Sequence, residues 1–177
     1  MEYLEQAERL HPSVPAELEL ARHHASNGRW QNAVELYSLV ANNSDARYAL
    51  ERASANYELA QLHLGVDQLA EAHEALSSAF QFRAKNAEVA WQLAQLSLDL
   101  SDDDAAKRAL RVLVSLKSGL EDGDDCVTAQ TKSKAYYYLG RMMNWQGDAA
   151  GARRMLGRAL EEDPANEFAQ ELQDRLN

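Results

Sequence analysis

The sequence predicts an all-α protein made of antiparallel helix pairs that stack on one another, and two observations lead to this prediction. First, the 177 residues are rich in strong helix formers and include only 3 Pro and 8 Gly, too few for a β protein with many tight turns. Second, a set of residues recurs at fixed offsets. Four alanines mark this recurrence: Ala33, Ala72, Ala106 and Ala152. Their positions differ by 39, 34 and 46 residues, which is a period of 34 with insertions of 5 and 12.

Each of these anchor alanines has the same neighbours. A leucine stands thirteen residues before it, followed at once by a small residue: Leu20-Ala21, Leu59-Ala60, Leu93-Ala94 and Leu139-Gly140. Large apolar residues stand four residues after it: Tyr37, Leu76, Leu110 and Leu156. Further apolar residues stand seven after it: Val40, Ala79, Leu113 and Ala159. Small residues let two helices approach closely, and the larger side chains fill the space between them. A single pair cannot bury its apolar stripe alone, so we expect the pairs to stack.

This pattern resembles the tetratricopeptide repeat (TPR) family. The last unit matches it most fully, with Tyr136, Leu139, Gly140, Gly147-Asp148, Ala152, Leu156, Ala159 and Pro164. The first unit matches in its second half, with Gly28-Arg29-Trp30, Ala33 and Tyr37. The two middle units keep the apolar residues and lack the turn glycine and the closing proline; Gly65 stands two residues too far from Ala72. The resemblance implies an α-solenoid that winds as a right-handed superhelix. The alternative is an unrelated α-bundle rich in Ala and Leu.

We expect a single domain over residues 1–177. Its predicted parts are a half repeat at 1–12, repeats at 14–45, 46–85, 86–119 and 126–164, and a capping helix at 165–177. The half repeat rests on Leu4, Ala7 and Pro12, which match the spacing of Leu156, Ala159 and Pro164; it is either a natural cap or the remnant of a longer array. In the capping helix, Phe168, Leu172 and Leu176 are predicted to share one face.

Capping residues predict where several helices begin. Ser13 precedes Pro15 and Glu17, while residues 42–45 and 101–104 are rich in the Asn, Ser and Asp that break one helix and cap the next. The 12-residue insertion falls within 117–131, which we expect to be a solvated loop before a long helix. No segment shows the alternation typical of a strand.

Composition excludes several classes of function. The net charge of −10 argues against nucleic acid binding, because a polyanion would be repelled. No apolar run reaches the length of a membrane helix, and no leader precedes the first repeat, so we expect a cytoplasmic protein; a trimmed leader would leave the periplasm open. Cys126 has no second cysteine to pair with, which suits a reducing compartment.

The sequence offers no motif for catalysis, a metal or a cofactor, so we expect none of the three. The acidic segment 121–125 does not fit an EF-hand, because its acids do not alternate and Ala129 stands where the closing glutamate belongs. The histidines are scattered, and His24 and His63 occupy equivalent repeat positions that helix packing explains. No phosphate-binding glycine loop or nucleophile elbow is present.

The resemblance implies that the first helix of each pair lines a concave groove that binds a protein or peptide. The residues predicted to face it are Arg22, Tyr57, Gln61, Trp91, Gln95, Tyr137, Arg141, Asn144 and Trp145. Aromatic rings supply rigid contact area, and Arg or Gln can pair with a carboxylate or a backbone. Two interpretations of Trp91 and Tyr137 remain open, exposure in the groove or burial between repeats. Tyr136 is predicted to be core, and Tyr138 fits either place.

The leading hypothesis is therefore a protein-interaction scaffold or adaptor without enzymatic activity. One family subtype grips a C-terminal carboxylate with Lys and Asn, and this chain departs from it because Leu18, Arg22, Tyr57 and Gln61 stand at those places. Two alternatives stay open: a self-assembling repeat domain that associates through Tyr3, Leu4 and Ala7, and a regulatory domain of a larger protein.

Overall fold

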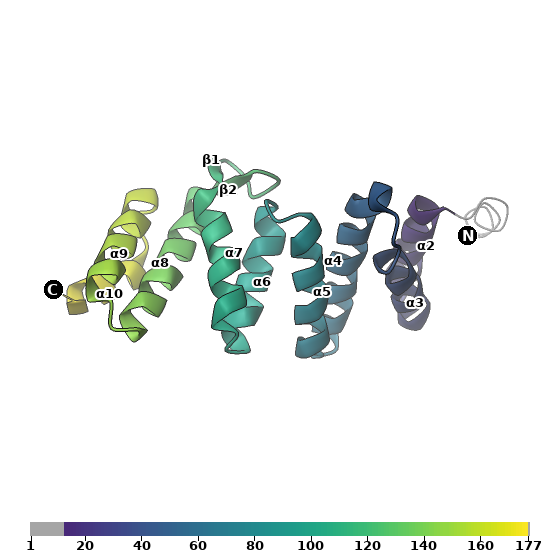
Figure 1. Cartoon of the computed structure of the whole chain (residues 1–177), viewed down its shortest axis with the longest axis horizontal. Coiled ribbons are helices and arrows are strands. Elements are labelled where there is room, and N and C mark those ends of the chain that lie inside the picture. Colours follow the sequence, from purple (N-terminus) through teal and green to yellow (C-terminus); the bar gives the residue numbers. More distant parts are fainter. Residues whose placement is uncertain (1–12, 177) are drawn as a thin grey trace. The chain divides into compact units, whose positions relative to one another are not determined.

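The computed structural model describes residues 13–176 as a series of helices with one short β ladder (Figure 1). The elements of the first half are α2 (Val14–Ser26), α3 (Trp30–Ala41), the 3-10 helix η1 (Ala46–Tyr48), α4 (Ala49–Gly65) and α5 (Leu69–Phe82). The elements of the second half are α6 (Ala87–Asp99), α7 (Asp103–Ser115), β1 (Lys117–Gly119), β2 (Cys126–Thr128), α8 (Ala129–Trp145), α9 (Ala149–Glu162) and α10 (Glu167–Leu176). The predicted half repeat at 1–12, with Tyr3, Leu4 and Ala7, lies outside the described residues.

The chain divides into two compact units, Met1–Arg83 and Ala84–Asn177, and each is described here by itself. In the first unit, α2 packs on α3, and α4 packs on both α3 and α5. In the second unit, α6 packs on α7, α7 on α8, α8 on α9, and α10 on α9. The prediction of an all-α helical-repeat fold is confirmed, while the prediction of one domain over 1–177 stays a prediction. None of the helices within 13–176 combines the length and apolar character needed to cross a membrane.

The four anchor alanines have equivalent places in the structure. Each is the fourth residue of its helix, in α3, α5, α7 and α9, and each is completely buried. The small residues of the partner helices, Ala21, Ala60 and Ala94, are also completely buried. In the last pair Gly140 takes this place, where an added Cβ would lie 3.3 Å from the carbonyl oxygen of Ala152 and 3.2 Å from Cγ of Leu156. The helices of a pair thus meet where both carry a small residue.

The turn inside each helix pair has three residues, and its middle residue always has a positive φ. These residues are Gly28 (71°), Asp67 (59°), Ser101 (60°) and Gly147 (83°). The next residue in each turn donates its N–H to a carbonyl of the preceding helix at 2.8 to 2.9 Å: Arg29 to His24, Gln68 to His63, Asp102 to Ser97 and Asp148 to Met143. This is the Schellman closure of a helix C-terminus. In the repeat formed by α4 and α5, the residue equivalent to the turn glycine is therefore Asp67, and Gly65 is the last residue of α4.

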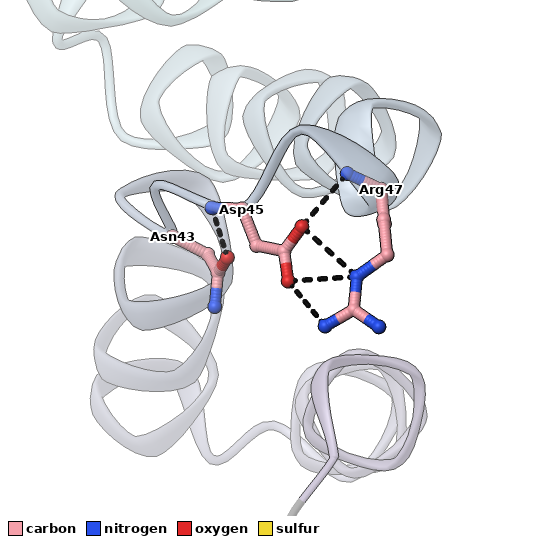
Figure 2. Close-up of polar contacts among 3 residues, drawn as sticks. All are labelled: Asn43, Asp45 and Arg47. Carbon is pink, nitrogen blue, oxygen red and sulfur yellow. Dashed lines mark hydrogen bonds and ion pairs between the residues drawn. The ribbon is translucent and has the colours of Figure 1, made fainter.

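A short polar junction joins α3 to α4 in the first unit (Figure 2). The Asn43 Oδ1 accepts the Asp45 N–H at 2.9 Å, and Asp45 Oδ1 accepts the Arg47 N–H at 3.0 Å. The Arg47 guanidinium also donates to both Asp45 oxygens, at 2.6 to 3.1 Å, and these bonds lower the pKa of the Asp45 carboxyl. As predicted, residues 42–45 end α3 and cap the next helical turn, since Asn42 is the C-cap of α3 and Asp45 is the N-cap of η1; α4 itself begins after Tyr48 without a side-chain cap. This junction takes up part of the 5-residue insertion.

The prediction of a plain loop over 117–131 is wrong. Strands β1 and β2 form a parallel pair in which Lys117, Ser118 and Gly119 stand opposite Cys126, Val127 and Thr128. Val127 is completely buried. The intervening segment also closes the start of α6, since Gly123 O accepts the Ala87 N–H and Asp124 Oδ1 accepts the Asn86 Nδ2, both at 2.9 Å. Strands of three residues are too short to show an alternating pattern, so only these contacts define them.

Lys132 of α8 ties this insertion to the helices behind it. Its Nζ lies 3.1 Å from the Leu116 carbonyl oxygen, 3.3 Å from Ser118 Oγ and 3.3 Å from Glu162 Oε1. The Lys132 and Glu162 side chains are only 12% and 25% exposed. The ammonium thus joins the end of α7, strand β1 and helix α9 at a largely buried point.

The capping helix α10 is held by a buried polar pair. Asn166 Oδ1 accepts the Ala169 N–H at 3.1 Å, and Asn166 Nδ2 donates to Ser133 Oγ at 2.8 Å. Ala169 is completely buried, and Leu172 and Leu176 pack beside it. The predicted grouping of Phe168 with those two leucines is only partly right, because Phe168 is 69% exposed. The Asn166 cap sets the rotation of α10 about its axis, and in this rotation Ala169 rather than Phe168 faces the core.

Replacing Asp67 by Gly is expected to raise the free energy of unfolding by roughly 0.5–1 kcal/mol, because a side chain at positive φ strains the backbone. Gly28→Ala is the reverse change, because it introduces a side chain at positive φ, and it is expected to lower the free energy of unfolding. No atom lies within 4 Å of the added Cβ, so the backbone conformation alone acts there. Urea unfolding followed by circular dichroism measures both variants. A neutral Gly28→Ala together with a destabilising Asp67→Gly would contradict the shared turn geometry.

Replacing Lys132 by Met is expected to lower the free energy of unfolding by about 1–3 kcal/mol, because the half-enclosed Glu162 carboxylate loses its partner. Lys85→Met is the control. The Lys85–Asp125 pair spans 3.2 Å, but both side chains are more than two-thirds exposed, so its loss should change stability by less than about 0.5 kcal/mol. Thermal unfolding of the two variants gives the comparison. Equal losses would show that Lys132 is no more than a surface charge.

Candidate partner-binding site

The structure brings six ring and guanidinium side chains of the second unit together. Four of them were predicted as partner-binding residues, and Tyr138 and Phe168 join them. We call this group the aromatic surface: Trp91, Tyr137, Tyr138, Arg141, Trp145 and Phe168. Four of its five rings follow one another in contact, with centroids 6.1 Å apart for Trp91 and Tyr138, 5.2 Å for Tyr138 and Tyr137, and 6.0 Å for Tyr137 and Phe168.

Three helices supply these side chains. Trp91 comes from α6, Phe168 from α10, and the other four from α8. Residues three or four apart on a helix share a face, so Tyr137, Tyr138, Arg141 and Trp145 lie along one side of α8. The opposite side of α8 contributes the buried Tyr136, Leu139 and Gly140 to the contact with α9. The same helix therefore supplies both the core and the surface.

The exposure of the rings shows which of them a partner can reach. Trp145 and Phe168 are 67% and 69% exposed, while Trp91, Tyr137 and Tyr138 are half-buried. Tyr136 is buried at 8% exposure, which confirms its predicted place in the core. Trp91 and Tyr137 are thus neither fully enclosed nor fully free, and each leaves part of its ring at the surface.

Arg141 lies among the rings of the aromatic surface. Its guanidinium carbon is 4.8 Å from the ring centroid of Tyr138, 4.9 Å from that of Trp145 and 6.0 Å from that of Tyr137. A second cation, the Lys134 ammonium, lies 5.9 Å from the ring centroid of Trp91. Such cation–π contacts hold the charged groups against the aromatic faces.

Two hollows border the aromatic surface. The first, of about 190 Å³, is lined by Gln95, Leu98, Asp99, Tyr138 and Arg141. The second, of about 280 Å³, is lined by Gln130, Lys134, Asp163, Ala165, Asn166, Glu167 and Phe168. Both are small, and each combines a ring of the surface with a cation and a carboxylate. Such hollows suit single side chains of a partner better than a whole cofactor.

The remaining predicted residues have mixed positions. In the second unit, Gln95 is exposed and lines the first hollow, and Asn144 is half-buried. In the first unit, Tyr57 and Gln61 are half-buried on α4, and the Arg22 guanidinium pairs with Glu19 at 2.6 Å and with Glu58 at 3.5 Å. A partner that engaged Arg22 would have to compete with these two carboxylates.

Tyr37 is the largest fully buried side chain of the first unit, and the charges of Arg22, Glu19 and Glu58 act on it. Tyr37 is 1% exposed. Burial, with a further contribution from Glu58, raises the pKa of its phenol to about 12. The phenol therefore stays neutral at physiological pH, as its place at a packing position requires.

Sequence reasoning missed an apolar hollow in the first unit. It measures about 420 Å³ and is lined by Trp30, Gln31, Val34, Glu35, Leu62, His63, Val66 and Gln68. Trp30 and Val66 are 58% and 66% exposed. Trp30 directly follows the turn at 27–29 and Val66 begins the turn at 66–68. The sequence therefore offered an apolar residue at each of two turns, which a repeat register alone does not distinguish from packing residues.

The histidines and acids do not gather into a metal site within the described part of the chain, where no three His, Cys, Asp or Glu side chains cluster suitably. His24 is buried, as packing predicted, and His63 Nδ1 lies 2.7 Å from Gln68 Oε1. Cys126 is a half-buried free thiol, 3.5 Å from the Glu121 carbonyl oxygen.

No protein-family model matches this sequence, and no curated protein matches it. Solved structures do. MamA from Desulfovibrio magneticus RS-1 is 13% identical with a TM-score of 0.57, over 93% of this chain and 83% of that one. A tetratricopeptide repeat protein from Parabacteroides merdae is 16% identical with a TM-score of 0.62, over 92% and 58%. The C-terminal part of a TPR repeat-containing protein from Cytophaga hutchinsonii is 13% identical with a TM-score of 0.59, over 99% and 63%. This chain has the tetratricopeptide-repeat fold.

Proposed function

We propose that this chain is a protein-interaction module whose aromatic surface binds a segment of another protein. The observation that supports this most directly is the continuous contact of Trp91, Tyr138, Tyr137 and Phe168 across three helices. Trp, Tyr and Arg are the residues that most often dominate binding energy at interfaces. A contiguous group of such side chains on a surface is typical of an interaction site.

The helices beneath the surface make it a rigid platform. Ser133 Oγ donates to the Ala159 carbonyl oxygen at 2.7 Å and accepts from Asn166, which links α8, α9 and α10. Preformed rings lose little conformational entropy on binding, so contact area converts into affinity more effectively. Either an extended segment or a helix laid across α6, α8 and α10 could supply that contact.

The proposal extends to the other residues predicted from the sequence. Gln95 and Asn144 would border the segment in the second unit, and Arg22, Tyr57 and Gln61 are proposed partner-binding residues of the first unit by itself. We propose a scaffold or adaptor role rather than catalysis. The half-buried free thiol of Cys126 suits a reducing compartment such as the cytoplasm.

The test is a selection of phage-displayed random dodecapeptides on the immobilised chain, followed by calorimetry on the peptides that are enriched. Replacing both Trp91 and Tyr137 by Ala is expected to weaken binding by more than about 2 kcal/mol, the size of an interface anchor. Trp30→Ala is the matched control, because Trp30 is an exposed tryptophan of the other unit. It should leave affinity unchanged within about twofold.

Since Trp91 and Tyr137 are half-buried, a second variant separates binding from folding. Trp145→Ala with Phe168→Ala removes two rings that are mostly exposed, and circular dichroism should show an unchanged fold. Unchanged affinity in both double variants would sink the proposal. So would a selection that enriches no peptide on the unaltered chain.

A further inference from the structure

Arg141 is a half-buried cation without an acidic partner. Its Nε is enclosed and donates to no acceptor among the described residues. Within residues 13–176, no carboxylate lies in ion-pairing distance of its guanidinium. Buried polar groups in folded proteins nearly always have a hydrogen-bond partner, so an arginine in this state calls for an explanation.

Three other arginines pair with carboxylates. Arg47 binds Asp45, Arg22 binds Glu19 and Glu58, and Arg175 binds Glu171. The sequence contains 28 acidic residues against 18 basic ones, so carboxylates are abundant. Several exposed arginines, such as Arg108, Arg111 and Arg158, also lack an ion pair with the other described residues, but solvent reaches them. Among the described arginines, Arg141 differs in having an enclosed Nε without an acceptor.

The rings also orient the guanidinium. Tyr138 and Trp145 lie within 4.9 Å of its central carbon, and Nε is covered. The terminal nitrogens are left for a ligand, at the edge of the 190 Å³ hollow that Arg141 shares with Gln95 and Asp99. A planar guanidinium held against aromatic faces is already arranged for two parallel bonds to a carboxylate.

A second cation beside the aromatic surface, Lys134, also lacks an acidic partner in the described part of the chain. Lys134, over the ring of Trp91, has no ion pair within the described residues. The carboxylates that face the surface are Asp99 in the first hollow and Asp163 and Glu167 in the second. None of them pairs with Arg141 or Lys134, so both cations remain available to an incoming anion.

We infer that the aromatic surface recognises a protein segment that presents an Asp or Glu side chain to Arg141, next to an apolar side chain that contacts Tyr138 and Trp145. This inference rests on the proposed function and adds the chemistry of the partner. A carboxylate would compensate the charge of the guanidinium in a place where rings have displaced water, and charge-assisted bonds there are stronger than in solvent.

The experiment uses the dodecapeptides enriched on the full chain, synthesised with acetylated and amidated ends so that side chains supply the only carboxylates. Asp and Glu should be over-represented among them. Exchanging the acidic residue of a peptide for Asn or Gln should weaken binding at least about tenfold, as should Arg141→Met in the chain. The two changes together should weaken binding little more than either alone, because they remove the same interaction.

Arg141→Lys is the conservative variant, because it keeps the charge and loses the planar fork, and an intermediate loss is expected. It also serves if Arg141→Met does not fold, since the peptide exchange and the lysine variant together decide the question. The inference is overturned if Trp91→Ala with Tyr137→Ala abolishes binding while the amide exchange and the Arg141 variants change it less than about twofold; the proposed function then stands. If no peptide is enriched, both are overturned.

Discussion

Each helix pair depends on one contact, where a small residue of the first helix meets an alanine near the start of the second. Ala33, Ala72, Ala106 and Ala152 are completely buried. An added Cβ at Gly140 would lie only 3.3 Å from the Ala152 carbonyl oxygen, so its neighbours would have to shift to admit it. Close approach of two backbones lets the leucines and large residues on either side fill the remaining space. Because the contact recurs at the same helix position in every pair, the turns, the helix caps and the solvent-exposed faces also fall at equivalent positions in each pair.

The turns show that backbone geometry matters here more than residue type. Gly28 and Gly147 adopt positive φ without strain, yet Asp67 and Ser101 adopt the same conformation at the same place. In all four turns the following N–H closes the helix on an equivalent carbonyl. The packing of the two helices fixes the distance that the three turn residues must span. Asp67 and Ser101 therefore adopt a positive φ although this conformation strains the backbone modestly.

The aromatic surface follows from the same alignment. Once Tyr136, Leu139 and Gly140 face α9, helical periodicity turns Tyr137, Tyr138 and Arg141 to another side of α8. Asn166 then sets the rotation of α10, which adds Phe168 to the row. The rings of Tyr137, Tyr138 and Trp145 contact the Arg141 guanidinium, so the packing of α8 against α9 also determines the surroundings of this cation.

The sequence by itself determined the fold class, the four anchor positions and the caps at residues 42–45, because these depend on local periodicity and on short-range hydrogen bonds. It also predicted Trp91, Tyr137, Arg141 and Trp145 as partner-binding residues, and the structure brings these four together in the aromatic surface. Only the tertiary structure decided that segment 117–131 forms a β ladder, that Phe168 turns outward, and that Arg141 lies among rings without an acid. Those features arise between residues distant in sequence, from α6, α8, α10 and the insertion, and pairwise contacts of that kind leave no periodic signal in a single chain.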